Sequence, residues 1–169
     1  MATPRPPATT TCSAISRFAR EAGLASATLS NSTIEHNQAL GGQLVGGTGA
    51  DGLGGGIPNV LGSTLTVSNR TLSYTQAVGG AGGAGGDGGN GLGGGIYNDG
   101  PSAFGVSSLT VAGSTITHNE ATGGAGGAGG SDGQGVGGGV YNLGLFGFDV
   151  VTVLRKNHAS TSNDDLFTT

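Results

Sequence analysis

The chain has very little charge. Only 9% of its 169 residues are charged, and the formal net charge is −4. A nucleic-acid-binding surface needs clustered Lys and Arg, so no nucleic-acid partner is expected. The single cysteine, Cys12, excludes an intramolecular disulfide. No apolar run approaches the roughly 20 residues of a membrane-spanning helix, and residues 1–23 lack the continuous apolar segment of a secretory signal.

Glycine is abundant instead, with 39 residues, and it recurs with a period. One group of segments reads GGGIPN, GGGIYN and GGGVYN, at 54–59, 93–98 and 137–142. A second reads ATLSNSTIEHNQA, LTVSNRTLSYTQA and LTVAGSTITHNEA, at 27–39, 65–77 and 109–121. A degenerate fourth copy contains RKNHAS. Two independent anchors with similar spacing indicate a tandem repeat, whose copies end near Ala39, Ala77, Ala121 and Ala159.

Apolar and polar residues alternate within each copy, which favours strands over helices. Leu65 and Val67 would face inward and Thr66 outward. Between strands, the column of Asn31, Asn69 and Gly113 holds residue types that tolerate a left-handed backbone, which indicates a tight corner. Three short strands per copy fit stacked parallel coils better than a four-stranded propeller blade.

We therefore predict an all-β parallel β-helix, a solenoid of about three to four coils with long glycine-rich insertions. The repeat domain would cover residues 27–169. Residues 1–26 would form an N-terminal tail, in which residues 13–26 could supply a short capping helix, because terminal repeats normally need caps. Exposed coil ends would invite self-association.

Asparagine also recurs in columns. In stacked parallel coils, identical amides lie about 4.7–4.9 Å apart and can form hydrogen-bonded ladders; asparagine is also common in turns. Both interpretations are structural. The expected ladder positions are Asn59, Asn98 and Asn142 in one group and Asn37, Asn119 and Asn157 in the other, with Thr75 breaking the second group.

GGGIYN followed by LTVxxSTITxN(E/Q)A resembles the coil repeat of bacterial right-handed β-helix proteins, including polymorphic outer-membrane proteins and autotransporter-type passenger domains. Their wider superfamily includes the pectate lyases. The resemblance covers residues 27–165. It implies a right-handed β-helix and an extracellular or cell-surface location, but it does not specify a function, because such repeats occur in adhesins and enzymes alike.

The glycine tracts at 79–95 and 123–139 allow two structures. They could be flexible loops extruded from one side of the solenoid. Alternatively, they could stack as extended layers, which only residues without a Cβ can do closely.

The tracts also match, in part, a calcium-binding nonapeptide, GGxGxDxUx. The segment GGTGADGLG at 46–54 fits with Asp51 as the acid, and GGDGGNGLG at 85–93 has Asn90 in that column with Asp87 nearby. Calcium prefers several carboxylate or carbonyl oxygens, and the acid column drifts to Gln134 in the third copy. Chance matching within a glycine tract is the competing explanation, so calcium stays a hypothesis.

Catalytic groups are not aligned. Glu35 shares its column with Ser73 and Thr117, and Glu120 shares its column with Gln38 and Gln76, so no column pairs two carboxylates for hydrolysis. His36 and His118 share a column with Tyr74 between them, which is too wide a separation for joint metal ligation.

The sequence thus favours a non-catalytic structural or surface-interaction module, adhesin-like, which could be a fragment of a larger exported protein. Its ligand would be an unknown surface or a carbohydrate, and no cofactor is expected other than the hypothetical calcium. The alternatives are a carbohydrate-active, pectate-lyase-like β-helix enzyme or its remnant, and a calcium-stabilised glycine-rich repeat.

Overall fold

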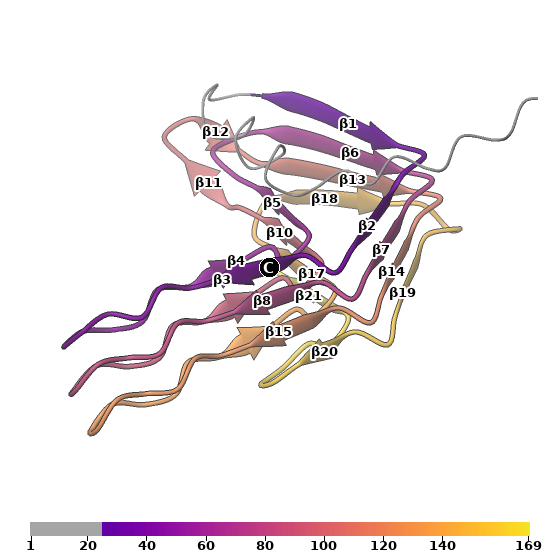
Figure 1. Ribbon diagram of the computed structural model, residues 1–169. Helices are drawn as coiled ribbons and strands as arrows, with labels where there is room; N and C mark the ends of the chain where they lie inside the picture. Colours follow the sequence, from indigo (N-terminus) through magenta and orange to yellow (C-terminus); the bar gives the residue numbers. More distant parts are fainter. Residues whose placement is uncertain (1–24) are drawn as a thin grey trace, which may run out of the picture.

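The computed structural model describes residues 25–169, and all regular secondary structure in this range is β-strand. Figure 1 shows the strands of successive repeats stacked as parallel layers. The predicted all-β architecture of stacked parallel strands, compatible with a parallel β-helix, is confirmed. Residues 1–24, which include most of the expected capping helix, lie outside the described residues. The first strand begins at Ser26.

Each repeat contributes one strand to each of four four-stranded parallel sheets within the described residues, and shorter strands make a fifth parallel sheet and a hairpin. Identical columns therefore pair across repeats, for example Leu65 with Leu109 and Asn98 with Asn142. The sheets, in their order of pairing, are β1 (Ser26–Ser30), β6 (Thr64–Ser68), β13 (Ser108–Ala112) and β18 (Leu145–Phe148); β2 (Thr33–Glu35), β7 (Thr71–Ser73), β14 (Thr115–Thr117) and β19 (Val153–Arg155); β3 (Gln38–Leu40), β8 (Gln76–Val78), β15 (Glu120–Thr122) and β20 (His158–Ala159); β5 (Ile57–Asn59), β10 (Ile96–Asn98), β17 (Val140–Asn142) and β21 (Leu166–Thr168); β4 (Gly52–Leu53), β9 (Gly91–Leu92) and β16 (Gly135–Val136); and the antiparallel hairpin β11 (Pro101–Ser102) and β12 (Gly105–Val106).

The core consists of apolar columns that face inward between these sheets. Leu65 and Val67 are buried while Thr66 between them is partly exposed, as the alternation predicted. Burying each such side chain contributes about 1.5–3 kcal/mol. Because one column supplies the same kind of side chain in successive layers, a simple repeat builds a continuous core. Its members are Ile34, Ile57, Leu65, Val67, Leu72, Ile96, Leu109, Val111, Ile116 and Val140.

The predicted corner column also has the expected backbone. Asn31, Asn69 and Gly113 have φ values of 55°, 52° and 56°, in the left-handed region that Gly and Asn tolerate best.

The glycine tracts, at residues 41–56 (first), 79–95 (second) and 123–139 (third), are stacked layers. In Figure 1 they extend from the body as three paired arms that lie side by side, following β3, β8 and β15. Within the second tract, Gly89 donates its N–H to the Gly80 carbonyl at 2.8 Å, and across to the third tract Gly124 donates to Gly89 at 2.8 Å. Backbone hydrogen bonds therefore join the two arms of a tract and also join one tract to the next.

These hydrogen bonds recur every third residue. Every third N–H of the second tract donates to every third carbonyl of the third tract. This three-residue repeat is typical of the polyproline II helix. A Cβ on Gly88 would lie 1.9 Å from the Gly124 carbonyl oxygen. The tracts are glycine-rich because neighbouring backbones leave no room for a side chain. The bonds run from Gly79, Gly82, Gly85, Gly88 and Gly91 to Thr122, Ala125, Ala128, Ser131 and Gln134.

The third tract ends the stack with side-chain caps. The fourth repeat has no glycine tract, so the outward N–H groups of the third tract need other acceptors. Ser160 Oγ accepts from Gly123 and Thr161 Oγ1 accepts from Gly135. A third cap is Asp132, whose Oδ1 accepts the N–H of Gly126 at 2.8 Å.

Candidate functional site

A second left-handed corner follows β2, β7 and β14, and it does not carry glycine or asparagine. His36, Tyr74 and His118 occupy it with φ values of 56°, 54° and 55°. A residue with a Cβ costs about 1–2 kcal/mol in this conformation. Strained backbone that persists in successive repeats suggests that the side chains themselves are needed. Lys156 occupies the same conformation in the fourth repeat, at 57°.

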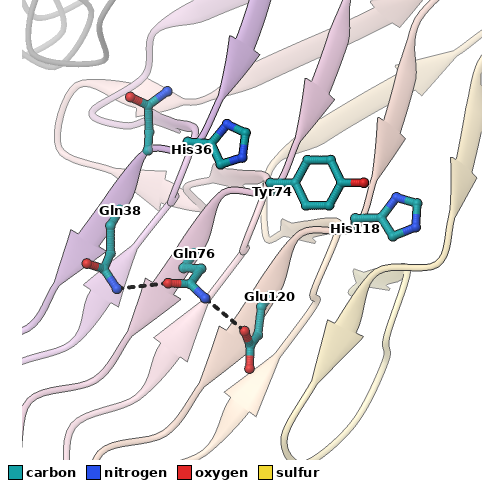
Figure 2. Close-up of a pocket in the computed structure, with 7 residues that line it drawn as sticks. His36, Gln38, Tyr74, Gln76, His118 and Glu120 are labelled. Carbon is teal, nitrogen blue, oxygen red and sulfur yellow. Dashed lines mark hydrogen bonds between the residues drawn. The ribbon is translucent and has the colours of Figure 1, made fainter.

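The three rings form a stacked column (Figure 2). The His36 and Tyr74 rings have centroids 5.4 Å apart with an interplanar angle of 8°, and the Tyr74 and His118 rings are 5.1 Å apart at 13°. Neighbouring rings therefore cover one another's faces. The two histidines lie on opposite sides of Tyr74, so they cannot share a metal ion whose ligands bind at about 2.0–2.1 Å.

A hydrogen-bonded polar column runs beside the rings. Gln38 Nε2 donates to Gln76 Oε1 at 2.9 Å, and Gln76 Nε2 donates to Glu120 Oε2 at 3.0 Å (Figure 2). The carboxylate at the end makes the last of these bonds charge-assisted. Thr122 Oγ1 also donates to Glu120 Oε1 at 3.2 Å. These bonds fix the side chains in one arrangement before any ligand is present.

The two columns line an open groove of about 410 Å³. Glu120 is the one carboxylate among its lining residues, and the other groups are amides and the three rings. Thr117 Oγ1 lies within hydrogen-bonding distance of His118 Nδ1, at 3.0 Å. The groove therefore offers rows of hydrogen-bonding groups that repeat along the stacking direction. Its lining residues are His36, Asn37, Gln38, Tyr74, Gln76, His118 and Glu120.

The residues considered for calcium lie in successive tracts, where their oxygens accept backbone hydrogen bonds. Asp51 Oδ1 accepts from the Asn90 N–H at 2.6 Å, and Asn90 Oδ1 accepts from the Gln134 N–H at 2.9 Å. Asp87 Oδ1 accepts from Ser131 at 2.8 Å. Each side chain thus links its tract to the next. Within residues 25–169, no cluster of three or more His, Cys, Asp or Glu side chains could hold a metal ion.

The first asparagine column forms a buried ladder. Asn59 Nδ2 donates to Asn98 Oδ1 at 2.7 Å, and Asn98 Nδ2 donates to Asn142 Oδ1 at 2.6 Å. All three side chains are at most 3% exposed. Thr168 Oγ1 accepts from Asn142 and ends the ladder.

The second column is a mixed ladder. Asn119 Nδ2 donates to Asn157 Oδ1 at 3.0 Å, and Thr75 Oγ1 donates to Asn119 Oδ1 at 2.9 Å. Thr75 thus joins the column that it interrupts in the sequence. Asp165 accepts from Asn157 at 2.8 Å. Asn37, at the other end of the column, lies at the groove.

Most other acidic side chains accept hydrogen bonds from backbone N–H groups. Asp149 accepts the Gly113 N–H and the Thr152 hydroxyl, and these bonds, the Thr152 contact foremost, lower the pKa of Asp149. Asp99 accepts the Tyr97 hydroxyl at 3.2 Å. Burial, and after it Asp99, raises the pKa of Tyr97 well above its usual range.

The sequence placed the histidines in one column and the glutamines in another, and it indicated surface or corner histidines, but it gave neither column a binding role. The sequence does contain a signal for the groove, because the columns that begin at His36 and Gln38 lie two positions apart and recur in three copies. What the sequence did not reveal was the left-handed backbone at His36, Tyr74 and His118. That backbone aligns their rings beside the glutamine column.

Comparisons of the chain with protein-family models, with curated proteins and with solved structures found no significant match. The described part of the chain contains no helix long and apolar enough to cross a membrane. The groove itself is therefore the basis for a functional proposal.

Proposed function

We propose that this chain is a non-catalytic interaction module that binds an extended ligand along the groove. The observation that carries the proposal is the ring column of His36, Tyr74 and His118, kept at a backbone cost in three successive repeats. If this corner had only a structural role, glycine or asparagine would adopt its left-handed backbone at a lower free-energy cost.

The repeat of the groove favours a polymer with a similar repeat. Parallel strands are spaced by about 4.7–4.9 Å, so each repeat presents one ring and one amide or carboxylate per step. An extended polysaccharide, whose sugars follow one another at a comparable interval and carry many hydroxyls, could bond to each step. Glu120 disfavours an acidic polymer, because like charges repel. We therefore favour a neutral polysaccharide at a cell or matrix surface.

A carbohydrate-cleaving enzyme is the alternative. Glycoside hydrolysis usually needs two carboxyl groups about 5–9.5 Å apart. Glu120 stands alone among the lining residues of the groove, which supports binding over cleavage. The parallel stacking and the sequence resemblance together support the finer proposal of a right-handed β-helix of four coils, the fourth abbreviated, in an extracellular or surface-exposed protein.

Affinity electrophoresis in native gels that contain soluble neutral polysaccharides tests the proposal. Tyr74→Gly removes the central ring and relieves its left-handed backbone, so the change in unfolding free energy should stay within about 1 kcal/mol. Asn69→Gly is the matched control, since it makes the same backbone change at the other corner, where φ is 52°.

We expect the wild type and Asn69→Gly to be retarded equally and Tyr74→Gly to migrate freely. Equal retardation of all three proteins would place binding elsewhere. If no neutral polysaccharide retards the wild type, the proposed ligand class is wrong. Release of reducing ends from a retained polysaccharide would instead favour the enzyme.

A further inference from the structure

Two outward-facing positions that are polar in the first three repeats are apolar in the fourth. Leu145 pairs with Ser108 of the preceding repeat, and Val153 pairs with Thr115. The earlier members of both columns are serine or threonine. Leu145 is nevertheless 63% exposed and Val153 38% exposed. Polar outward positions have thus become apolar without gaining burial.

The corner between β18 and β19 adds two more apolar side chains. Val150 is 102% exposed and Val151 64% exposed. We call the three valines at this corner, Val150, Val151 and Val153, the lateral patch; Leu145 lies at the far end of β18. A further parallel repeat would pair with the strand edges of β18 and β19 but would leave outward side chains uncovered. Exposed apolar clusters of this kind mark interaction sites, so the covering partner should approach from the side.

The charges around the corner are self-complementary. Asp149 precedes the valines and Arg155 follows them, so the segment 149–155 reads DVVTVLR, with opposite charges at equal distances from Thr152. Asp149 is held in place by the Gly113 N–H and Thr152. Arg155 is exposed and forms no ion pair within residues 25–169.

A two-fold axis near Thr152 satisfies both features at once. It brings the apolar corner of one copy against the same corner of a second copy. It also places each Asp149 near Arg155 of the other copy, in two equivalent ion pairs. Such self-complementarity is what an isologous dimer interface requires. An anionic membrane would gain from Arg155 and Lys156 but would be repelled by Asp149.

We propose that the lateral patch is the interface of a two-fold homodimer of this chain. The valines of the patch belong to the fourth repeat and the groove residues to the first three, although Arg155 pairs with Thr117, next to His118 of the groove. The interface does not require the proposed polysaccharide. Dimerisation would present two grooves on one particle, which raises the avidity for a polymeric ligand.

Sedimentation velocity of the full chain over a micromolar concentration series tests this interface. We expect a monomer–dimer equilibrium that Val151→Lys weakens at least about tenfold. Arg155→Glu should also weaken it, whereas Arg155→Lys should retain it. Thr28→Lys is the control, because Thr28 is an exposed outward residue of β1 in the first repeat. Thermal melts of each variant verify folding.

A monomer at every concentration would overturn the proposal. A dimer that withstands Val151→Lys, or that Thr28→Lys weakens equally, would place the interface elsewhere. Co-sedimentation of a monomeric wild type with phosphatidylserine vesicles, lost in Val151→Lys, would assign the patch to a membrane instead.

Discussion

Replacing Gly88 by alanine tests whether the glycine tracts are packed layers. A Cβ at this position would lie 1.9 Å from the Gly124 carbonyl oxygen and 2.8 Å from the Gly133 nitrogen. Real Cβ atoms do not approach backbone so closely, so the second and third tracts would have to separate. Gly42→Ala in the first tract is the matched control, because its Cβ would meet no atom within 4 Å.

The expected cost follows from the hydrogen bonds at the contact. Separation would break the bonds from Gly88 to Ser131, from Gly124 to Gly89 and from Gly127 to Gly86. At a net value of about 1 kcal/mol each, Gly88→Ala should lose about 3 kcal/mol of stability. This corresponds to a decrease in Tm of about 6–12 °C for a chain of this size. Gly42→Ala should gain about 0.4–1 kcal/mol by restricting the unfolded chain.

Thermal melts and amide hydrogen exchange measure the two effects. In Gly88→Ala, we expect protection to fall at the amides of Gly79, Gly82 and Gly85, which donate to the third tract. Gly42→Ala should keep their protection. If both variants melt and exchange alike, the tracts are flexible loops in solution and the layered packing is refuted.

Three further predictions concern other layers of the fold. Asn98→Ala should lower the free energy of unfolding by about 3 kcal/mol, because it breaks three side-chain hydrogen bonds in a buried ladder. Chemical denaturation measures this loss, with Thr66→Ala as the control variant. Folding lowers the pKa of Asp149 below its usual value of 3.8. The contribution of this carboxylate to folding stability is therefore present above pH 3.8 and is lost as the pH falls through the folded-state pKa. Asp149→Asn should therefore lower the Tm at pH 7 more than at pH 2, and an equal decrease at both would contradict this. If calcium binds at Asp51, millimolar calcium should raise the Tm and a chelator should reverse the rise, whereas an unchanged melt would exclude it.

The sequence predicted the stacked strands well because their signal lies in side chains. Leu65 and Val67 alternate with Thr66, and the next copy repeats this alternation, so period and burial pattern together indicate parallel layers. The asparagine corner at Asn31 and Asn69 was predictable for a similar reason, since few residue types tolerate its backbone.

The tracts were harder to predict because glycine has no side chain to reveal its neighbours. A flexible loop and a packed layer can share one composition. The distinguishing signal was the spacing, since GGAGGAGGDGGN at 79–90 places a larger residue at every third position. That spacing matches the three-residue repeat of the hydrogen bonds. Asp132 interrupts it in the third tract, where it caps Gly126.

The two corners together make the strongest case for the groove. Both require a left-handed backbone, and their φ values differ little, with 52° at Asn69 and 54° at Tyr74. If backbone geometry alone decided the residue type, both corners would carry asparagine or glycine. The first corner does, whereas the second carries His36, Tyr74 and His118. Stacking between exposed rings adds only about 0.5–1.5 kcal/mol for each pair, which at most offsets the backbone cost of about 1–2 kcal/mol for each residue. Stability therefore gives little reason to prefer these rings over glycine, which supports the proposed recognition of a ligand along the groove.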